Sequence, residues 1–501
     1  MHALPAQPPA DAAPTVPSLD LAALTAPEAP AVPAPAPAWP WWQRIGFRYL
    51  LVFFALYAFP HPLTALLGTI AGALGNAAER LDQAWLTAGP FGWPGLCAAG
   101  LGEVDSGWRL LTTWLDHQGL APYEVIHQRT GSGDTGHAIA RLLVVTALSA
   151  LATIIWSLWQ RRAVGYPRLG RWLHLVVRFH LAFVMLSYGL SKFYGGQFGE
   201  LSLTRLTQEI GDTWPMSMVG TFMQASKPYE LFAGAGEVIG ALLLFHRRTA
   251  LLGACVTMGV MTNVCALNWL CGVPVKLSSA FLLACTVFLM APYGNRLWTL
   301  FVSNRPSQPV DLTVPTSRWL RWPLLVVAYG WVIGTLFVSH VQRSAPRPWM
   351  QGQEKSALYG VWMVDKMLLD GQEVPVTDAT RWRFFAIDRG TLAWVREAAG
   401  THRYFDFAWD AATGTAQVKP RTGAADTVPV PWTCKQGSKI VPVDPPLLLR
   451  GEDRGKKIDG ERRTLVLEGQ WGGKQLELHT VEKVFRLQTG FRLRQELPDF
   501  W

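Results

Sequence analysis

Charged residues are scarce in this sequence. They make up 16% of its 501 residues, whereas a soluble domain usually carries about 25%. The deficit is local, because charges are sparse across residues 45–342 and ordinary from residue 343 onward. This asymmetry argues against a single soluble domain and predicts a membrane part followed by a water-exposed part.

Cysteine is scarce too, and its spacing argues against two kinds of site. The six cysteines form no CxxC pair and no Cys/His metal spacing, so neither a redox dithiol nor a zinc site is predicted. They are Cys97, Cys255, Cys265, Cys271, Cys285 and Cys434. Cys97 and Cys434 fall on the side expected to be oxidising. The sequence favours unpaired thiols and leaves a disulfide between them open.

Common catalytic motifs are absent as well. The chain has no HExxH, no P-loop, no G-x-S-x-G and no metal-spaced histidine cluster, so no metal site is predicted. Residues 131–136 (GSGDTG) fit G-x-G-x-x-G, but no strand precedes them, and we interpret them as a flexible approach to the next apolar segment. The net charge of +9 lies largely in short loops between apolar segments, which argues against nucleic-acid binding.

Long apolar runs are what the sequence has instead. Seven segments are long and apolar enough to cross about 30 Å of hydrocarbon as helices. Their approximate limits are 45–74, 138–160, 172–194, 229–246, 249–270, 275–292 and 323–342. Pro60 and Pro62 predict a kink or an early end in the first. The fold class predicted here is a polytopic α-helical membrane protein of about seven transmembrane helices, with a C-terminal all-β domain.

Basic residues predict the orientation of these spans. The loop between the second and third spans contains four arginines and no acid (RRAVGYPRLGR, 161–171), and the loops after the fourth and sixth spans are also basic. The opposite loop, 79–134, has seven acids against three arginines. Basic loops stay in the cytoplasm. We therefore expect a bacterial inner-membrane protein with a cytoplasmic amino terminus and an extracytoplasmic carboxyl terminus.

The termini of the chain differ in composition from the spans. Residues 1–40 are rich in proline and alanine and predict a disordered cytoplasmic tail rather than a signal peptide.

The expected order after this tail is two amino-terminal helices within 41–171, a four-helix core at 172–292, and a loop with the seventh helix at 293–342. Between the third and fourth spans, segment 202–230 is amphipathic and predicts an interfacial helix.

Residues 343–501 predict a β-rich extracytoplasmic domain. Short alternating or apolar-aromatic runs such as RWRFFAI are separated by turn signals, including Asp370-Gly371 and Gly472-Gly473. Six to eight strands indicate a small barrel or sandwich. Gly360-x-Trp362 resembles the opening motif of lipocalins, and a tryptophan plugging one end of a small barrel would explain it without a ligand.

Ionisable residues inside the apolar segments are the candidate functional residues. Charges are costly in hydrocarbon, so their presence there suggests a site by default. The binding candidates are Arg178, Lys192, Glu230, Glu237, Asn263, Asn268 and Lys276. Depth along the spans makes a Lys192–Glu230 pair reasonable, and it makes Arg178 the leading partner for Glu237 near the bilayer centre. His180 is interpreted as a hydrogen-bonded packing residue.

Two interpretations of these residues stay open. They form either an outward-opening polar pocket or a set of ion pairs and amide contacts that hold the helices together. The depth of Glu237 favours a pocket somewhat, whereas Lys192 and Lys276 lie near enough to the interface to snorkel. No catalytic residue is predicted.

The stretch 178–292 resembles the DoxX-like family of bacterial four-helix membrane proteins. The resemblance rests on RFHLAFVMLSYGLSKF (178–193), which ends in Gly189-x-x-Lys192, and on the following helix with Gly236-Glu237 in a small-residue setting. It covers about a quarter of the chain and implies a four-helix core. A weaker likeness, carried by the layout and by GLSKFYGG (189–196), is to vitamin-K-carboxylase-like proteins.

Three functions remain as hypotheses. The family resemblance implies a component of a membrane redox system with a quinone at Glu237, although no redox cysteine pair is present and the sequence leaves the cofactor open. The second is a non-enzymatic assembly or docking protein whose β domain binds a protein partner. The third is a small-solute transporter, for which inverted repeats would be expected and none is evident. The sequence leaves open whether the protein is an enzyme.

Overall fold

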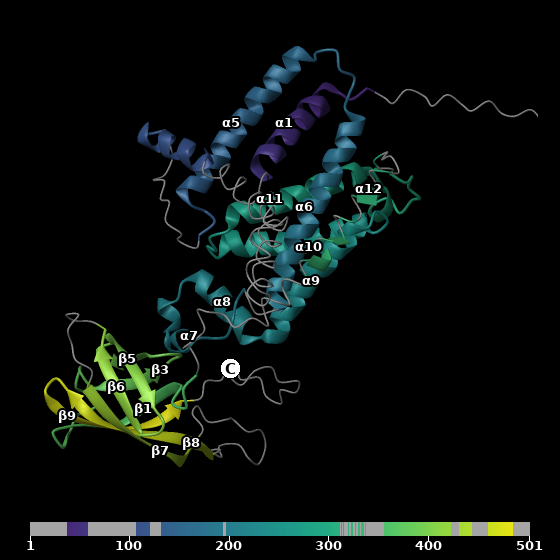
Figure 1. Ribbon diagram of the computed structural model, residues 1–501. Helices are drawn as coiled ribbons and strands as arrows, with labels where there is room; N and C mark the ends of the chain where they lie inside the picture. Colours follow the sequence, from purple (N-terminus) through teal and green to yellow (C-terminus); the bar gives the residue numbers. More distant parts are fainter. Residues whose placement is uncertain are drawn as a thin grey trace, which may run out of the picture.

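The computed structural model has a helical part and a β-barrel (Figure 1). It describes residues 38–58, 107–120, 132–193, 197–310, 355–421, 430–442 and 459–483, with single positions between 312 and 336. Residues 1–37 of the predicted amino-terminal tail lie outside the described residues. So do most of loop 79–134 and the end of the chain.

Five helices are long and apolar enough to cross a membrane, which makes this a multi-pass membrane protein by length and composition. They are α5 (Gly136–Trp159), α6 (Pro167–Phe193), α9 (Lys227–Phe245), α10 (Ala250–Leu270) and α11 (Lys276–Met290), the last extended by η3 (Ala291–Tyr293) and α12 (Gly294–Phe301). They agree with the second to sixth predicted spans. The third begins earlier than predicted, at Pro167, because a proline is accepted in the first helical turn.

The first and seventh predicted spans are described only in part. The first begins within α1 (Trp41–Ala58), and its continuation, with Pro60 and Pro62, lies outside the described residues. Of the seventh, scattered positions between 322 and 336 are described, and they are helical. A count of seven therefore stays a prediction.

The helices share one apolar core. Its fully buried side chains come mainly from α6, α9, α10 and α11, among them Leu181, Met185 and Leu244, and α1 adds Phe47. His180 lies between the rings of Phe54 and Phe281, at centroid distances of 5.5 and 5.8 Å. These ring contacts agree with a packing role for His180, and the hydrogen bond expected of it stays a prediction.

The predicted interfacial segment between the third and fourth spans is three short helices. They are α7 (Leu203–Thr207), η2 (Ile210–Asp212) and α8 (Pro215–Ala225). Pro215 begins α8 because its missing N–H costs nothing at a helix start. Apolar side chains of this segment are exposed, including Trp214 and Phe222, as expected at a membrane surface.

The carboxyl-terminal part is a closed antiparallel barrel of eight strands. β1 (Gly360–Leu369) pairs with β3 (Trp382–Ile387), and consecutive pairing continues through β4 (Leu392–Glu397), β5 (His402–Asp410), β6 (Thr415–Pro420), β7 (Val430–Pro442), β8 (Asp459–Trp471) and β9 (Lys474–Lys483). β9 pairs back to β1 and closes the barrel. The two-residue β2 (Gln372–Glu373) extends β1 at one edge. The barrel alternative of the sequence prediction is thus confirmed.

Two predicted turns set the register of the hairpins. Leu369 pairs with Gln372, so Asp370 and Gly371 form a two-residue loop with φ of 52° and 77°. Gly472 and Gly473 join β8 to β9 in the same way, with φ of 57° and 79°. Both central residues of a type I′ turn need positive φ, which Asp-Gly and Gly-Gly adopt at low cost.

Aromatic side chains fill the barrel. Trp382 is fully buried, and its ring centroid lies 6.2 Å from that of Trp432 and 5.2 Å from that of Trp471. Trp362 of the Gly-x-Trp motif is also buried near the beginning of β1; its Nε1 donates to the Leu358 carbonyl oxygen at 2.9 Å. The Arg463 guanidinium lies 5.1 Å from the Trp362 ring. Trp362 therefore closes this part of a packed barrel interior, which accounts for the Gly360-x-Trp362 motif without a ligand.

Candidate functional site

One buried ion pair joins two spans at the predicted site. The Lys192 ammonium of α6 donates to both carboxylate oxygens of Glu237 on α9, at 2.8 and 2.6 Å. Both residues are only 4% exposed. The predicted pairing of Glu237 with Arg178 is therefore wrong. A charge this well buried requires a partner of opposite sign, and Lys192 reaches Glu237 from the last turn of α6.

Two glycines allow these helices to approach closely enough for that pair. A Cβ on Gly189 would lie 2.7 Å from the Val238 Cγ2 atom and 2.9 Å from the Gly234 carbonyl oxygen, and one on Gly234 would lie 3.0 Å from the Gly189 carbonyl oxygen. No larger residue fits there without moving a backbone. Gly189 precedes Lys192 by three residues, so the Gly-x-x-Lys motif couples a close helix contact with the cation that crosses it.

Glu230 has a different partner from the predicted one. Its Oε2 lies 2.6 Å from the Lys227 ammonium, within the first turn of α9, so the predicted Lys192–Glu230 pair is wrong. Lys227 is half exposed, and it also donates to the Lys192 carbonyl oxygen at 3.3 Å. Glu230 is buried and its Oε1 has no hydrogen-bond partner among the described residues. Lys227 was missed, although the i, i+3 spacing in KPYE was a readable signal.

Lys276 belongs to a separate cluster at the start of α11. Asp134 accepts from the backbone N–H groups of Lys276 and Leu277 at 2.8 and 3.0 Å, and its Oδ2 lies 3.6 Å from the Lys276 ammonium. Gly133 donates from its backbone N–H to the Pro274 carbonyl oxygen at 2.7 Å. The predicted flexible approach is thus a cap, because an aspartate satisfies the free amides of a helix start.

The remaining candidates do not join one pocket. Asn268 is buried on α10, whereas Asn263, five residues earlier, is exposed. Arg178 lies over the Phe179 ring, with its guanidinium carbon 5.1 Å from the centroid. The structure therefore brings Lys192 and Glu237 together, places Glu230 beside them through Lys227, and pairs Lys276 with Asp134.

A buried arginine outside the predicted set, Arg48 on α1, contacts the end of α5 and the residue that precedes α6. Arg48 donates from NH1 to the Ser157 hydroxyl at 2.7 Å, and from Nε and NH2 to the Tyr166 hydroxyl at 3.0 and 2.7 Å. Its guanidinium carbon lies 5.3 Å from the Tyr166 ring centroid. Its neutral partners are 109 to 118 residues away in the chain, so no local sequence signal predicts this contact.

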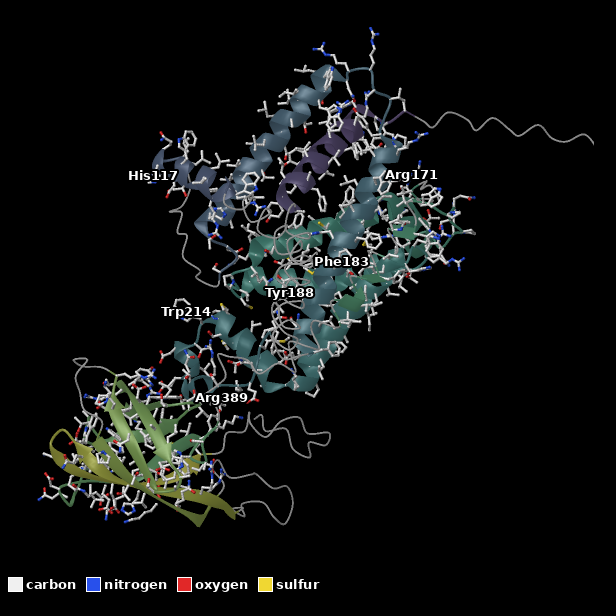
Figure 2. All side chains as sticks on the ribbon, in the orientation of Figure 1. His117, Arg171, Phe183, Tyr188, Trp214 and Arg389 are labelled. Carbon is white, nitrogen blue, oxygen red and sulfur yellow. The ribbon has the colours of Figure 1, made fainter. Side chains whose placement is uncertain are left out.

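The barrel is fastened to the helical part through α7. Leu203 is buried against Val361, Phe384, Ala386 and Trp394 on the outer face of β1, β3 and β4. Around this contact, Glu200 accepts from Lys355 at 2.9 Å and from Arg389, and Glu209 accepts from Arg396 at 2.5 Å. Arg389 lies at the side of the barrel nearest α7 (Figure 2). The contact combines a small apolar centre with an ionic rim.

The cysteines that the structure describes are free thiols. Cys434 is a free thiol buried in the barrel, and burial raises its pKa to about 12, so the reactive thiolate is rare at neutral pH. Cys97, its possible disulfide partner, lies outside the described residues. Among the described residues, no group of three or more histidine, cysteine, aspartate or glutamate side chains could hold a metal ion.

The chain was compared with family models, solved structures and curated proteins. No family model matches this chain, and no solved structure does. A stretch of 113 residues is 36% identical to the uncharacterized protein YwoB of Bacillus subtilis (strain 168), and the match covers 22% of this chain and 71% of that protein. The chain therefore belongs to the same family as YwoB.

Proposed function

We propose that this chain is a non-enzymatic membrane protein that presents its β-barrel to a protein partner on the extracytoplasmic side of the bacterial inner membrane. The observation that carries the proposal is the seating of the barrel on α7, with Leu203 in an apolar contact and Glu200 and Glu209 in ion pairs around it. A barrel held in this way has a defined position over the bilayer. Such an arrangement suits the presentation of a binding surface.

The interior of the barrel supports docking rather than ligand storage. Its centre holds Trp382, Phe385 and Trp432, all buried and in ring contact. Close-packed aromatic interiors stabilise a fold and leave little room for a small molecule. Strands β5 to β8 lie outside the apolar contact with α7 and carry outward polar residues of both signs, such as Asp406 on β5 and Lys435 on β7. Arg421, which directly follows β6, pairs with Asp406. A partner would bind there through hydrogen bonds and ion pairs.

The intramembrane charges serve the same proposal as a helix clamp. Lys192 and Glu237 neutralise each other across a close helix contact. The pair can therefore hold α6 against α9 without any bound substrate. We further propose the orientation that the basic loops indicate, with the amino terminus cytoplasmic, and a DoxX-like four-helix core for residues 172–292.

A quinone-linked redox role is the second candidate, and one observation favours it. The Glu230 Oε1 atom is buried without a hydrogen-bond partner among the described residues, close to the Lys192 end of the clamp. An unsatisfied carboxylate oxygen can accept a hydrogen bond from a hydroxyl group such as that of a quinol.

Site-specific photo-crosslinking in native membranes tests the docking proposal. A photoreactive residue at Tyr404 on β5 or at Gln417 on β6 should give one adduct of a single mass. The matched control is Val376, which is 78% exposed and lies outside β5 to β8. The docking proposal fails if neither strand position gives an adduct that the control lacks. Quinol binding by the purified protein that Glu230→Gln abolishes would support the second candidate instead.

A further inference from the structure

Arg178 is a cation in a membrane span, and no described residue gives it an anionic partner. Its Nε is buried without a hydrogen-bond partner, and no carboxylate among the described residues forms an ion pair with it. By contrast, each of the intramembrane carboxylates Glu230 and Glu237 has a lysine. An unpaired guanidinium in an apolar segment is costly, so its environment in the membrane is expected to supply a negative charge.

The same helix face carries a second arginine nearer the cytoplasm. Arg171, His174 and Arg178 follow a spacing of three and four residues, which places them on one face of α6. Figure 2 labels Arg171 at the end of α6 distant from the barrel. Arg178 lies about 16 Å along the helix axis from the start of α6. Because helical side chains tilt toward the helix start, its guanidinium is directed back toward Arg171.

Neighbouring elements mark this face as the level of the lipid headgroups. His174 Nε2 lies 3.1 Å from the Leu289 carbonyl oxygen at the end of α11, and its ring lies 6.3 Å from that of Tyr293 in η3. η3 leads directly into α12, where Trp298 and Phe301 are 64% and 75% exposed. Exposed aromatic side chains on a short amphipathic helix are typical of the interface between hydrocarbon and headgroups.

We propose that the α6 face bearing Arg171 and Arg178, beside Tyr293, binds the phosphate of an anionic phospholipid in the cytoplasmic leaflet. A guanidinium matches phosphate with two parallel hydrogen bonds. A tyrosine hydroxyl donates a further bond at headgroup depth. The acyl chains then lie along the apolar surface of the bundle, a position that a free phosphate would leave empty. The leaflet assigned here rests on the proposed orientation.

Lipid retention by the purified full-length protein tests this site. Wild-type protein in mild detergent is supplied with equal amounts of phosphatidylglycerol and phosphatidylcholine, and bound lipid is counted by native mass spectrometry. We expect about ten-fold preference for phosphatidylglycerol, equivalent to about 1.4 kcal/mol. Arg178→Gln should remove most of that preference, and Arg178→Lys should keep part of it and guard against a folding defect.

A matched control and a second ligand sharpen the result. Arg247→Gln removes an exposed cation from the predicted cytoplasmic loop between α9 and α10 and should leave the preference unchanged. Equal losses in Arg178→Gln and Arg247→Gln would overturn the site, as would equal retention of the two lipids by wild type. Displacement of phosphatidylglycerol by millimolar inorganic phosphate would overturn the lipid assignment. No partner protein is needed, so the outcome is independent of the docking proposal.

Discussion

The helical part and the barrel bury polar and apolar groups in opposite ways. Between the spans, a few charged side chains such as Lys192 and Glu237 are buried, and they are paired across glycine contacts. The barrel interior instead contains large aromatic rings around Trp382, and several of its ion pairs lie on the surface, as between Lys435 and Glu468. In lipid the hydrophobic effect does not hold helices together, so close packing and polar contacts must do so. In water, burial of apolar surface is enough.

The largest effect expected from this comparison is in the barrel. Trp382→Ala removes the ring that contacts Phe385, Phe405 and Trp432. It should lower the free energy of unfolding of the barrel by about 3–5 kcal/mol, because the cavity cannot be filled by its neighbours. Hydrogen exchange measured by mass spectrometry on the full chain should show faster exchange in β3 and β4 and unchanged exchange in α6 and α9.

The control for this change is Val376→Ala, at an exposed position of the same domain. It should alter stability by less than about 0.5 kcal/mol. If exchange in α6 and α9 rose together with that in the barrel, the two parts would unfold as one unit and the comparison would be wrong.

An intermediate effect is expected from the ion pair between the spans. Lys192→Met and Glu237→Gln each leave one buried group without its partner, whereas the double variant leaves none charged. A double-mutant cycle should give a coupling energy of about 1–3 kcal/mol, measured by unfolding in mixed detergent micelles. Arg247→Gln, at an exposed position between α9 and α10, serves as the control and should cost less. Additive single effects would contradict the clamp.

The smallest effect is expected where the two parts meet. Hydrogen bonding to Lys355, together with the charges of Lys355 and Arg389, lowers the pKa of Glu200. A carboxyl group whose pKa is lowered by docking stabilises the docked state above its ordinary pKa, and this contribution is lost as pH falls through the lowered value. Spin labels on α8 and β5 should report a broader distance distribution as pH falls below the ordinary pKa of a glutamate.

Leu203 limits that effect, because its apolar contact with the barrel does not titrate. Glu200→Gln should remove the pH dependence and leave the barrel seated at neutral pH. A pH response that persists unchanged in Glu200→Gln would assign the effect to another group.

The sequence predicted elements better than partners. Five of its apolar segments are helices of membrane length, and the alternating carboxyl-terminal runs form a barrel. Both signals are local, since periodicity and run length depend on neighbouring residues. The predicted partner of Glu237 was wrong because depth along a helix does not say which way each side chain faces around the helix axis. The close helix contact at Gly189 also brings Lys192 within reach of Glu237. Asp134 was missed for a similar reason, because it caps a helix 142 residues later.

The kinds of element and their order follow from local sequence patterns: apolar helices with sparse charges, then strands with Asp-Gly and Gly-Gly turns. These depend on short-range sterics and on the solvent that each residue prefers. Only the tertiary structure decided which lysine neutralises Glu237, how the barrel closes through β1 and β9, and where α7 seats it. Those choices depend on contacts between residues far apart in the chain, whose energies arise only when the helices and strands are packed together.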